Sequence, residues 1–248
     1  MREFADHFSQ LSARYAEYRP RYPEGLFDAI AAASPRRRRL WDCATGSWQA
    51  AAPLAGRFDT VVASDASRQQ LHSATPHPGI RYLAARAESA PLRERWADVV
   101  TVAQALHWLD LPEFYAEVRR VLVPRGLFVA WTYGLQRIGD SAMDALLEDF
   151  YDRVVGPYWA PERRLVETGY RTLDFPFDEV PLASPPMTGH WALGQLLGYV
   201  STWSAVAKCR NVTGVDPMLE LQARLEPLWG EPERQRHIEW PITVRAGR

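Results

Sequence analysis

LWDCATGSWQA, residues 40–50, has the order of a short strand, a tight turn and the start of a helix. Its apolar run ends in an acid, Asp42, and Gly46 follows in the turn. Turns that approach a ligand or another backbone closely favour glycine and other small residues. Trp48 departs from that rule, so the stretch predicts a strand–turn–helix unit with a bulky residue in its turn.

Strands and helices alternate on either side of this unit. Residues 97–105 (ADVVTVAQA) contain a continuous β-branched run, which is typical of strands buried on both faces of a parallel sheet. Apolar residues recur at helical spacing in 24–34 and 114–122. The alternation predicts an α/β fold, a Rossmann-like, doubly wound, mostly parallel sheet with helices on both faces. The other strands are expected at 40–44, 59–65, 81–89 and 126–133.

The pattern changes after about residue 136. Residues 141–155 have the spacing of an amphipathic helix, and the segments beyond them are richer in Pro and Trp. We expect a single domain over 1–248, with a core at 1–135, C-terminal cap helices at 136–210 and a final helix and strand at 211–248.

Composition excludes several classes of function. The 29 basic and 30 acidic residues leave a net charge of −1, which gives no reason to expect nucleic acid or an anionic membrane as a partner. The basic run PRRRR (35–39) then has the character of a solvated loop. Two cysteines form no disulfide framework, and six scattered histidines show no metal-ligand spacing. With no signal peptide or membrane span in the sequence, we expect a cytoplasmic protein.

Candidate ligand-binding residues follow the predicted strands. In a doubly wound sheet the ligand lies at the carboxyl ends of the strands. Asp65 ends the second strand 19 residues after Gly46, a spacing that suits an acid holding ribose hydroxyls, although a solvated strand end would look the same. Glu88 follows the third strand and His107 the fourth, at the mouth of the same edge.

Segments along nearly the whole chain resemble one enzyme family. The chain resembles class I S-adenosylmethionine-dependent methyltransferases of the small-molecule type, in particular the trans-aconitate methyltransferase group. The resemblance implies S-adenosylmethionine as cofactor, a core that binds it and a cap that covers a small-molecule substrate. The segments that carry it are DHFSQLSARYAEYRPRYP (6–23), SDAS (64–67), AES (87–89), AQALHWLD (103–110), RRVLVPRGLFVAW (119–131), GPYWAPER (156–163) and LGYVSTWSAV (197–206).

The same resemblance implies a role for each matching residue. Tyr15 and Arg19 would hold the methionine end of the cofactor, with Arg19 pairing its carboxylate. Ala44 and Gly46 would pass beneath the methionine and ribose, and Asp65 would take the ribose hydroxyls. The remaining cofactor-binding positions are Ala66, Ala87 and Glu88 around the adenine, and Gln104 and Ala105 near the sulfonium.

The turn departs from the family pattern Asp-x-Gly-x-Gly-x-Gly. Ala44 replaces the first glycine and Trp48 the third. A side chain at a position of positive φ is disfavoured, and an indole is bulky. The ring would either turn away into the helix packing or enter the cofactor's volume, where it would weaken or abolish binding. Arg125, in place of a glycine in a Pro-Gly-Gly turn, is expected to be harmless.

Aromatic residues in the second half predict an acceptor pocket. His107 is the candidate general base, with packing or orientation of the acceptor as the alternative. The expected reaction is methyl transfer to a carboxylic acid or to a ring nitrogen or hydroxyl of a heterocycle. The alternatives are other small-molecule chemistry without methyl donation, motivated by Trp48, and non-catalytic binding. The candidate substrate residues are Trp48, Trp108, Trp131, Tyr133, Tyr158, Trp159, Arg163 and Trp203.

Overall fold

The central sheet has six strands in the order β3-β2-β1-β4-β5-β8. The computed structural model describes residues 18–46, 48–72, 74, 76–183 and 185–248. Neighbouring strands from β3 to β5 run parallel, and β8 pairs antiparallel with β5. The sheet comprises β1 (Arg39–Cys43), β2 (Thr60–Asp65), β3 (Ile80–Ala84), β4 (Ala97–Ala103), β5 (Leu122–Tyr133) and β8 (Ile242–Gly247). The predicted mostly parallel, Rossmann-like sheet is confirmed.

Helices cover both faces of this sheet. Leu40 of β1 belongs to the larger buried cluster, together with α2 (Glu24–Ala33) and α3 (Ala51–Ala55). Its neighbour Trp41 belongs to the second cluster, with α5 (Leu111–Val121). Successive side chains of a strand point to opposite faces, so the continuous apolar runs reflect burial on both sides. Short α4 (Arg68–His72) and η2 (Leu106–Trp108) follow β2 and β4.

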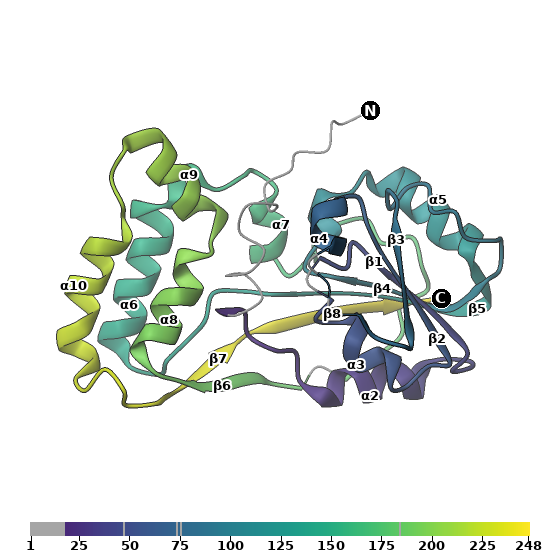
Figure 1. Cartoon of the computed structure of the whole chain (residues 1–248), viewed down its shortest axis with the longest axis horizontal. Helices are drawn as coiled ribbons and strands as arrows, with labels where there is room; N and C mark the ends of the chain where they lie inside the picture. Colours follow the sequence, from purple (N-terminus) through teal and green to yellow (C-terminus); the bar gives the residue numbers. More distant parts are fainter. Residues whose placement is uncertain (1–17, 47, 73, 75, 184) are drawn as a thin grey trace.

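Four helices form a lobe to one side of the sheet (Figure 1). This helical lobe consists of α6 (Ser141–Asp149), α8 (Leu193–Ser201), α9 (Ser204–Thr213) and α10 (Met218–Trp229). The last of these, α10, packs beside α6 and α8, so it lies among the cap helices. After α6 the chain passes through the turns η3 (Phe150–Val154) and η4 (Gly156–Tyr158) to α7 (Arg163–Glu167), which lies between the lobe and the sheet (Figure 1).

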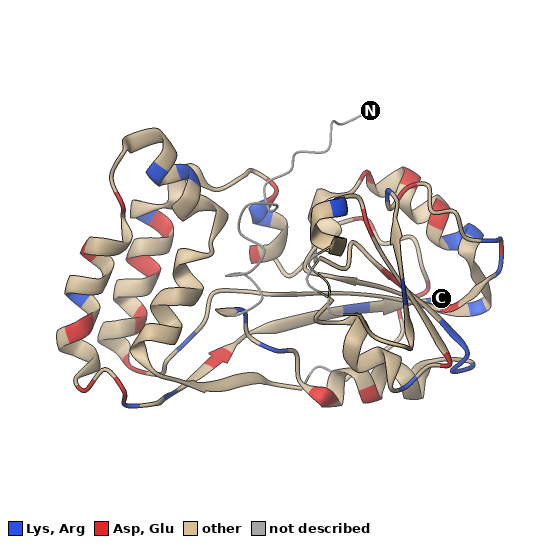
Figure 2. Cartoon of the chain, viewed as in Figure 1, with Lys and Arg blue, Asp and Glu red and all other residues tan. Residues whose placement is uncertain are grey.

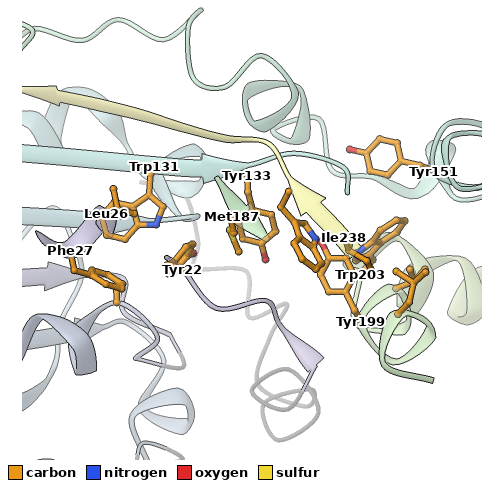
Figure 3. Packing of buried hydrophobic residues seen from close by; sticks show 14 of the residues in the cluster. Tyr22, Leu26, Phe27, Trp131, Tyr133, Tyr151, Met187, Tyr199, Trp203 and Ile238 are labelled. Atoms are coloured by element: carbon orange, nitrogen blue, oxygen red, sulfur yellow. The ribbon is translucent and has the colours of Figure 1, made fainter. Parts of the chain in front are cut away.

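The lobe and the sheet share one buried core. Strands β6 (Met187–Trp191) and β7 (Arg236–Trp240) pair antiparallel, and Pro241 alone separates β7 from β8. Figure 3 shows the packing from Phe27 and Trp131 under the sheet, through Tyr133, to Tyr199 and Trp203 in the lobe. Residues of α2, α3, the sheet and the helical lobe belong to this one cluster, and the single domain stays a prediction.

Some predicted bounds differ from the structure. The third strand ends at Ala84, because the chain then turns toward α5 and carries Ala87 and Glu88 in a loop. The strand predicted to reach residue 105 ends at Ala103, where Gln104 adopts a φ of 55°. The predicted helix 141–155 is α-helical to Asp149 and continues as a π-helical turn, η3.

The basic run 35–39 is a loop as far as Arg38, and Arg39 begins β1. The backbone N–H groups of Arg38 and Arg39 both donate to Asp98 Oδ2, at 3.1 and 3.0 Å. Arg36 forms an ion pair with the same carboxylate, at 3.7 Å. Figure 2 shows acidic and basic residues distributed over both the sheet and the helical lobe. Among the described residues, none of the helices is long and apolar enough to span a bilayer.

Candidate functional site

The turn after β1 keeps a glycine-like backbone at alternate positions. Ala44, Gly46 and Trp48 have φ angles of 52°, 51° and 54°. A left-handed conformation costs a non-glycine residue roughly 1–2 kcal/mol, so two of these positions are strained. A Cβ added to Gly46 would meet no described atom within 4 Å. Within the described part of the chain, the space beside Gly46 is therefore unoccupied.

Trp48 lies half-buried against the larger core cluster. Its backbone N–H donates to the Thr45 carbonyl at 2.9 Å, and its carbonyl accepts from the Ala52 N–H at 3.1 Å. These bonds join the turn to the start of α3. Trp48 thus has part of its apolar surface packed against the core.

Asp65 faces the turn from the end of β2. Its Oδ2 accepts the Gly46 N–H at 2.9 Å, and its Oδ1 accepts the Ser67 N–H at 2.8 Å. A carboxylate has about four lone-pair sites, so both oxygens can accept further hydrogen bonds from ligand hydroxyls. Ala66, the next residue, is exposed. The arrangement fits a ribose and an adenine beside the open turn.

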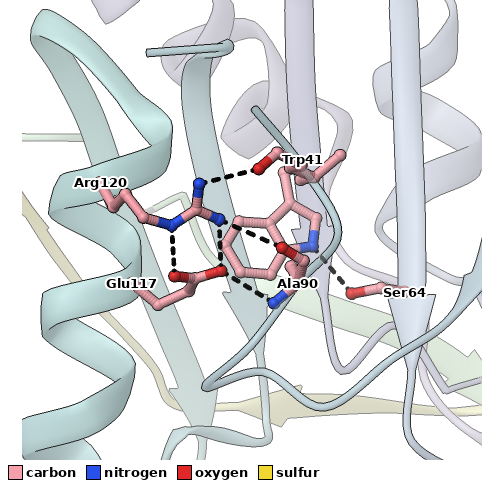
Figure 4. A network of polar contacts seen from close by, with 6 residues as sticks. Trp41, Ser64, Ala90, Glu117 and Arg120 are labelled. Carbon is pink, nitrogen blue, oxygen red and sulfur yellow. Dashed lines mark hydrogen bonds and ion pairs between the residues drawn. The ribbon is translucent and has the colours of Figure 1, made fainter. Parts of the chain in front are cut away.

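The loop after β3 is fixed to α5 by an ionic network (Figure 4). Glu117 Oε1 accepts the Ala90 N–H at 2.8 Å, and Arg120 Nη2 donates to the Ala90 carbonyl at 3.1 Å. Arg120 and Glu117 also pair with each other, at 2.7 Å. The buried Ala87 and the half-buried Glu88 lie in this loop, just before Ala90. Glu88 Oε1 accepts the Asp110 N–H at 3.1 Å.

Asp42 is a buried acid beneath the turn. Thr45 Oγ1 donates to one of its oxygens at 2.6 Å and Thr101 Oγ1 to the other at 2.7 Å. Burial raises the pKa of the Asp42 carboxyl from 3.8 to about 6, against the lowering effect of these two hydrogen bonds. Asp42 thus joins the turn to β4, and its charge varies near neutral pH.

We expect protonation of Asp42 to stabilise the fold. Between the unfolded pKa of 3.8 and the folded value of about 6 the folded chain binds more protons, so this stability is lost as the pH rises through 6. Lowering the pH from about 7.5 to about 5 should add about 1 kcal/mol to the free energy of unfolding. Burial lowers the pKa of His107, so this residue changes the stability in the opposite direction over the same pH range. The measurement is therefore the free energy of unfolding in urea of the protein minus that of Asp42→Asn, taken at both pH values. A difference independent of pH would contradict the assignment.

Gln104 joins the ends of β4 and β5. Its Oε1 accepts from Thr132 Oγ1 at 2.5 Å and from the Tyr133 N–H at 2.9 Å, and its Nε2 donates to the Tyr133 carbonyl at 3.2 Å. The amide is thus engaged at both ends, and Ala105 follows it half-buried at the start of η2. These contacts form the floor of a pocket between the sheet and the helical lobe.

The pocket encloses a volume of about 50 Å³ and opens to solvent. Of the predicted substrate residues, Trp108, Tyr133, Trp159, Arg163 and Trp203 line it. Sequence reasoning missed Tyr199, although its spacing of four from Trp203 was a signal that the two rings lie together. The described residues that line the pocket are Arg19, Gln104, His107, Trp108, Tyr133, Trp159, Ala160, Arg163, Tyr199, Trp203 and Ser204.

Other predicted residues lie elsewhere. Trp131 is fully buried and packs edge-on against Tyr22, with ring centroids 5.5 Å apart. Trp48 and Tyr158 are half-buried and are not among the described lining residues. Tyr15 lies outside the described residues.

Arg19 lies at the boundary between the sheet and the helical lobe. Its Nη1 donates to Tyr133 Oη at 2.9 Å, and its guanidinium lies 5.5 Å from the centroid of the Tyr199 ring. Tyr18, the residue before it, packs directly on Gly198 of α8. These contacts hold a cation at the wall of the pocket.

His107 is buried at the end of β4. Its Nδ1 lies 2.9 Å from Tyr170 Oη. Burial and, secondarily, the nearby charge of Arg163 lower the pKa of the imidazole to about 3. The ring is therefore neutral at physiological pH and a weak proton acceptor, which fits the alternative of packing or orientation of the acceptor. The general-base role stays a prediction.

Known proteins resemble this chain in fold and in sequence. A family described as a methyltransferase domain matches residues 41–130. A Dictyostelium discoideum protein named as a methyltransferase is 30% identical over 226 residues, which cover 90% of this chain and 86% of the relative. The chain belongs to the methyltransferase family. A solved type II methyltransferase from Anaeromyxobacter dehalogenans is 44% identical, with a TM-score of 0.85 over 93% of this chain and 98% of that one.

The family assignment makes this chain an S-adenosylmethionine-dependent methyltransferase. A methyltransferase from an antibiotic biosynthesis pathway of Anabaena variabilis shares the fold, with 17% identity and a TM-score of 0.54. Membership of the trans-aconitate group stays a prediction. In the described part of the chain, no group of three or more acidic, His or Cys side chains is arranged to hold a metal ion.

Proposed function

We propose that this methyltransferase transfers a methyl group to a small molecule held between the sheet and the helical lobe. One observation carries the proposal: residues at the ends of β4 and β5 line one side of the pocket, and aromatic residues near the lobe line the opposite side. Gln104, His107 and Tyr133 line one side, and Trp159 and Trp203 line the other. Aromatic walls with a few convergent polar groups suit a small organic ligand.

The donor side fits S-adenosylmethionine. The space beside Gly46 and the Asp65 carboxylate suit the methionine–ribose portion. The loop with Ala87 and Glu88, which Glu117 holds through the Ala90 N–H, suits the adenine. Arg19 would pair the methionine carboxylate. When bound, the cofactor supplies an electrophilic methyl group on its sulfonium.

Positioning is the main task of the protein in this reaction. Methyl transfer is a displacement at an activated carbon, so holding the acceptor atom in line gives much of the rate. A neutral His107, fixed by Tyr170, can hold the acceptor through a hydrogen bond. This role suits acceptors with an available lone pair, such as a ring nitrogen or an ionised oxygen.

Titration of S-adenosylmethionine and S-adenosylhomocysteine into the protein and into Trp48→Gly tests the donor site. We expect micromolar binding by the protein, and affinity within about threefold in Trp48→Gly, because the indole packs on the core and the positive φ strains the free and the bound protein alike. The check is isothermal calorimetry, followed by transfer of labelled methyl to a panel of small heterocycles and acids.

Other results would favour the alternatives. Binding by Trp48→Gly alone would mean that the indole closes the donor site, and would favour chemistry without methyl donation. Binding by neither protein would favour a non-catalytic role. Binding without transfer to any small molecule would contradict the proposed acceptor class.

A further inference from the structure

Arg163 presents a fixed cation to the pocket. It begins α7, and its guanidinium lies 4.7 Å from the centroid of the Trp159 ring and 5.4 Å from that of Tyr151. Its Nε donates to Tyr151 Oη at 2.6 Å. Within the part of the chain that the structure describes, its terminal nitrogens Nη1 and Nη2 have no hydrogen-bond partner. They are the two donors that match a carboxylate.

Two residues outside the pocket lining fix the orientation of this guanidinium. Tyr151 Oη accepts from Arg163 and donates to Glu167 Oε1 at 2.8 Å. Tyr151 lies in η3, and π-helical turns occur frequently at functional sites. Its ring also packs on Trp159 and Trp203, with centroids 5.0 and 5.6 Å away. Tyr151 and Glu167 are therefore positioning residues for Arg163.

The charge of the pocket provides an independent argument. Its described lining includes two arginines and no carboxylate, and the one histidine is neutral. Arg19 is assigned to the donor, so Arg163 is the cation left for the acceptor. The sulfonium of the donor would add a further positive charge. An anionic acceptor complements this field, and a cationic one is repelled.

We propose that the acceptor is a small, flat carboxylate, anchored by Nη1 and Nη2 of Arg163 and stacked among Trp159, Trp203 and Tyr199. This inference rests on the proposed function and specifies its substrate class.

The anchored carboxylate is not the group that accepts the methyl. Formation of a C–O bond as the S–C bond breaks would neutralise the carboxylate. The Arg163 ion pair would then stabilise the ground state more than the transition state. The methyl group instead goes to another atom of the acceptor, whose lone pair forms the new bond while the S–C electron pair returns to sulfur.

Matched carboxylates and amides test the anchor. The probes are benzoate, cinnamate, nicotinate, anthranilate and indole-3-acetate, each with its own amide, titrated into protein saturated with S-adenosylhomocysteine. At least one acid should bind roughly tenfold or more tightly than its amide, as expected for a charge-assisted pair. Arg163→Gln should abolish that preference. Arg164→Gln, which removes an exposed neighbouring charge, should preserve it. Tyr151→Phe should reduce the preference for the acid over its amide. Arg163→Lys should keep part of the preference that Arg163→Gln loses.

Specific results would overturn the inference. If no acid is preferred, including the case in which no acid binds, or if the preference survives in Arg163→Gln, the anchor is wrong. Binding of S-adenosylhomocysteine is recorded for every variant. If the unaltered protein does not bind S-adenosylhomocysteine, the proposed function is contradicted. If it binds S-adenosylhomocysteine but shows no preference for acids over amides, only the role of Arg163 as carboxylate anchor is contradicted.

Discussion

Replacing Asp65 with alanine is expected to weaken S-adenosylmethionine binding by at least tenfold. A hydrogen bond to a charged group contributes about 1.5–3 kcal/mol, and 1.4 kcal/mol corresponds to about tenfold in affinity. The substitution would remove the ribose contacts proposed for the carboxylate. It would also release the N–H groups of Gly46 and Ser67, which Asp65 holds at 2.9 and 2.8 Å. Calorimetric titration with S-adenosylmethionine and S-adenosylhomocysteine measures the effect.

Asp59→Ala is the matched control for this experiment. Asp59 is an exposed acid just before β2, at the end opposite to Asp65, so its loss should leave affinity unchanged. Asp65→Asn keeps one acceptor oxygen without the charge and should bind with intermediate affinity. If Asp65→Ala binds as tightly as the unaltered protein, the ribose assignment is wrong.

The sheet could be predicted because each strand obeys a local rule. A continuous β-branched run such as Val99–Val102 reflects burial on both faces, and burial of that kind is readily recognised in the sequence. The turn could be predicted for a similar reason, since its spacing persists although Ala44 and Trp48 replace glycines. Local patterns thus locate the donor edge of the sheet.

The pocket could be predicted only in part, because its walls meet through packing between distant segments. Trp131 and Tyr133 lie on the same face of β5. Tyr133, at the end of the strand, lines the pocket, whereas Trp131 packs edge-on against Tyr22. The low pKa of His107 arises from burial and, secondarily, from the charge of Arg163, which lies 56 residues away in the sequence, so spacing does not reveal it.

Replacing Trp203 with alanine is expected to lower the free energy of unfolding by about 3–5 kcal/mol, the usual range for a buried aromatic residue. Trp203 is 4% exposed, and its ring lies at the centre of an aromatic cluster. Its neighbours are Tyr151, Trp159, Tyr199 and Phe150, with centroids 5.6, 5.8, 5.9 and 6.3 Å away. Urea unfolding of Trp203→Ala and of the milder Trp203→Phe measures the loss.

Trp203→Ala should also separate the two halves of the site. Asp65 and Gly46 lie at the sheet edge, whereas Trp203 holds Tyr151 and Trp159, which in turn position Arg163. Below its unfolding temperature the variant should therefore bind S-adenosylhomocysteine nearly normally and lose the preference for carboxylates over amides. Trp96→Ala, remote from the pocket at the amino end of β4, should change neither property. Equal loss of donor and carboxylate binding in Trp203→Ala would mean that the lobe shapes the donor site directly.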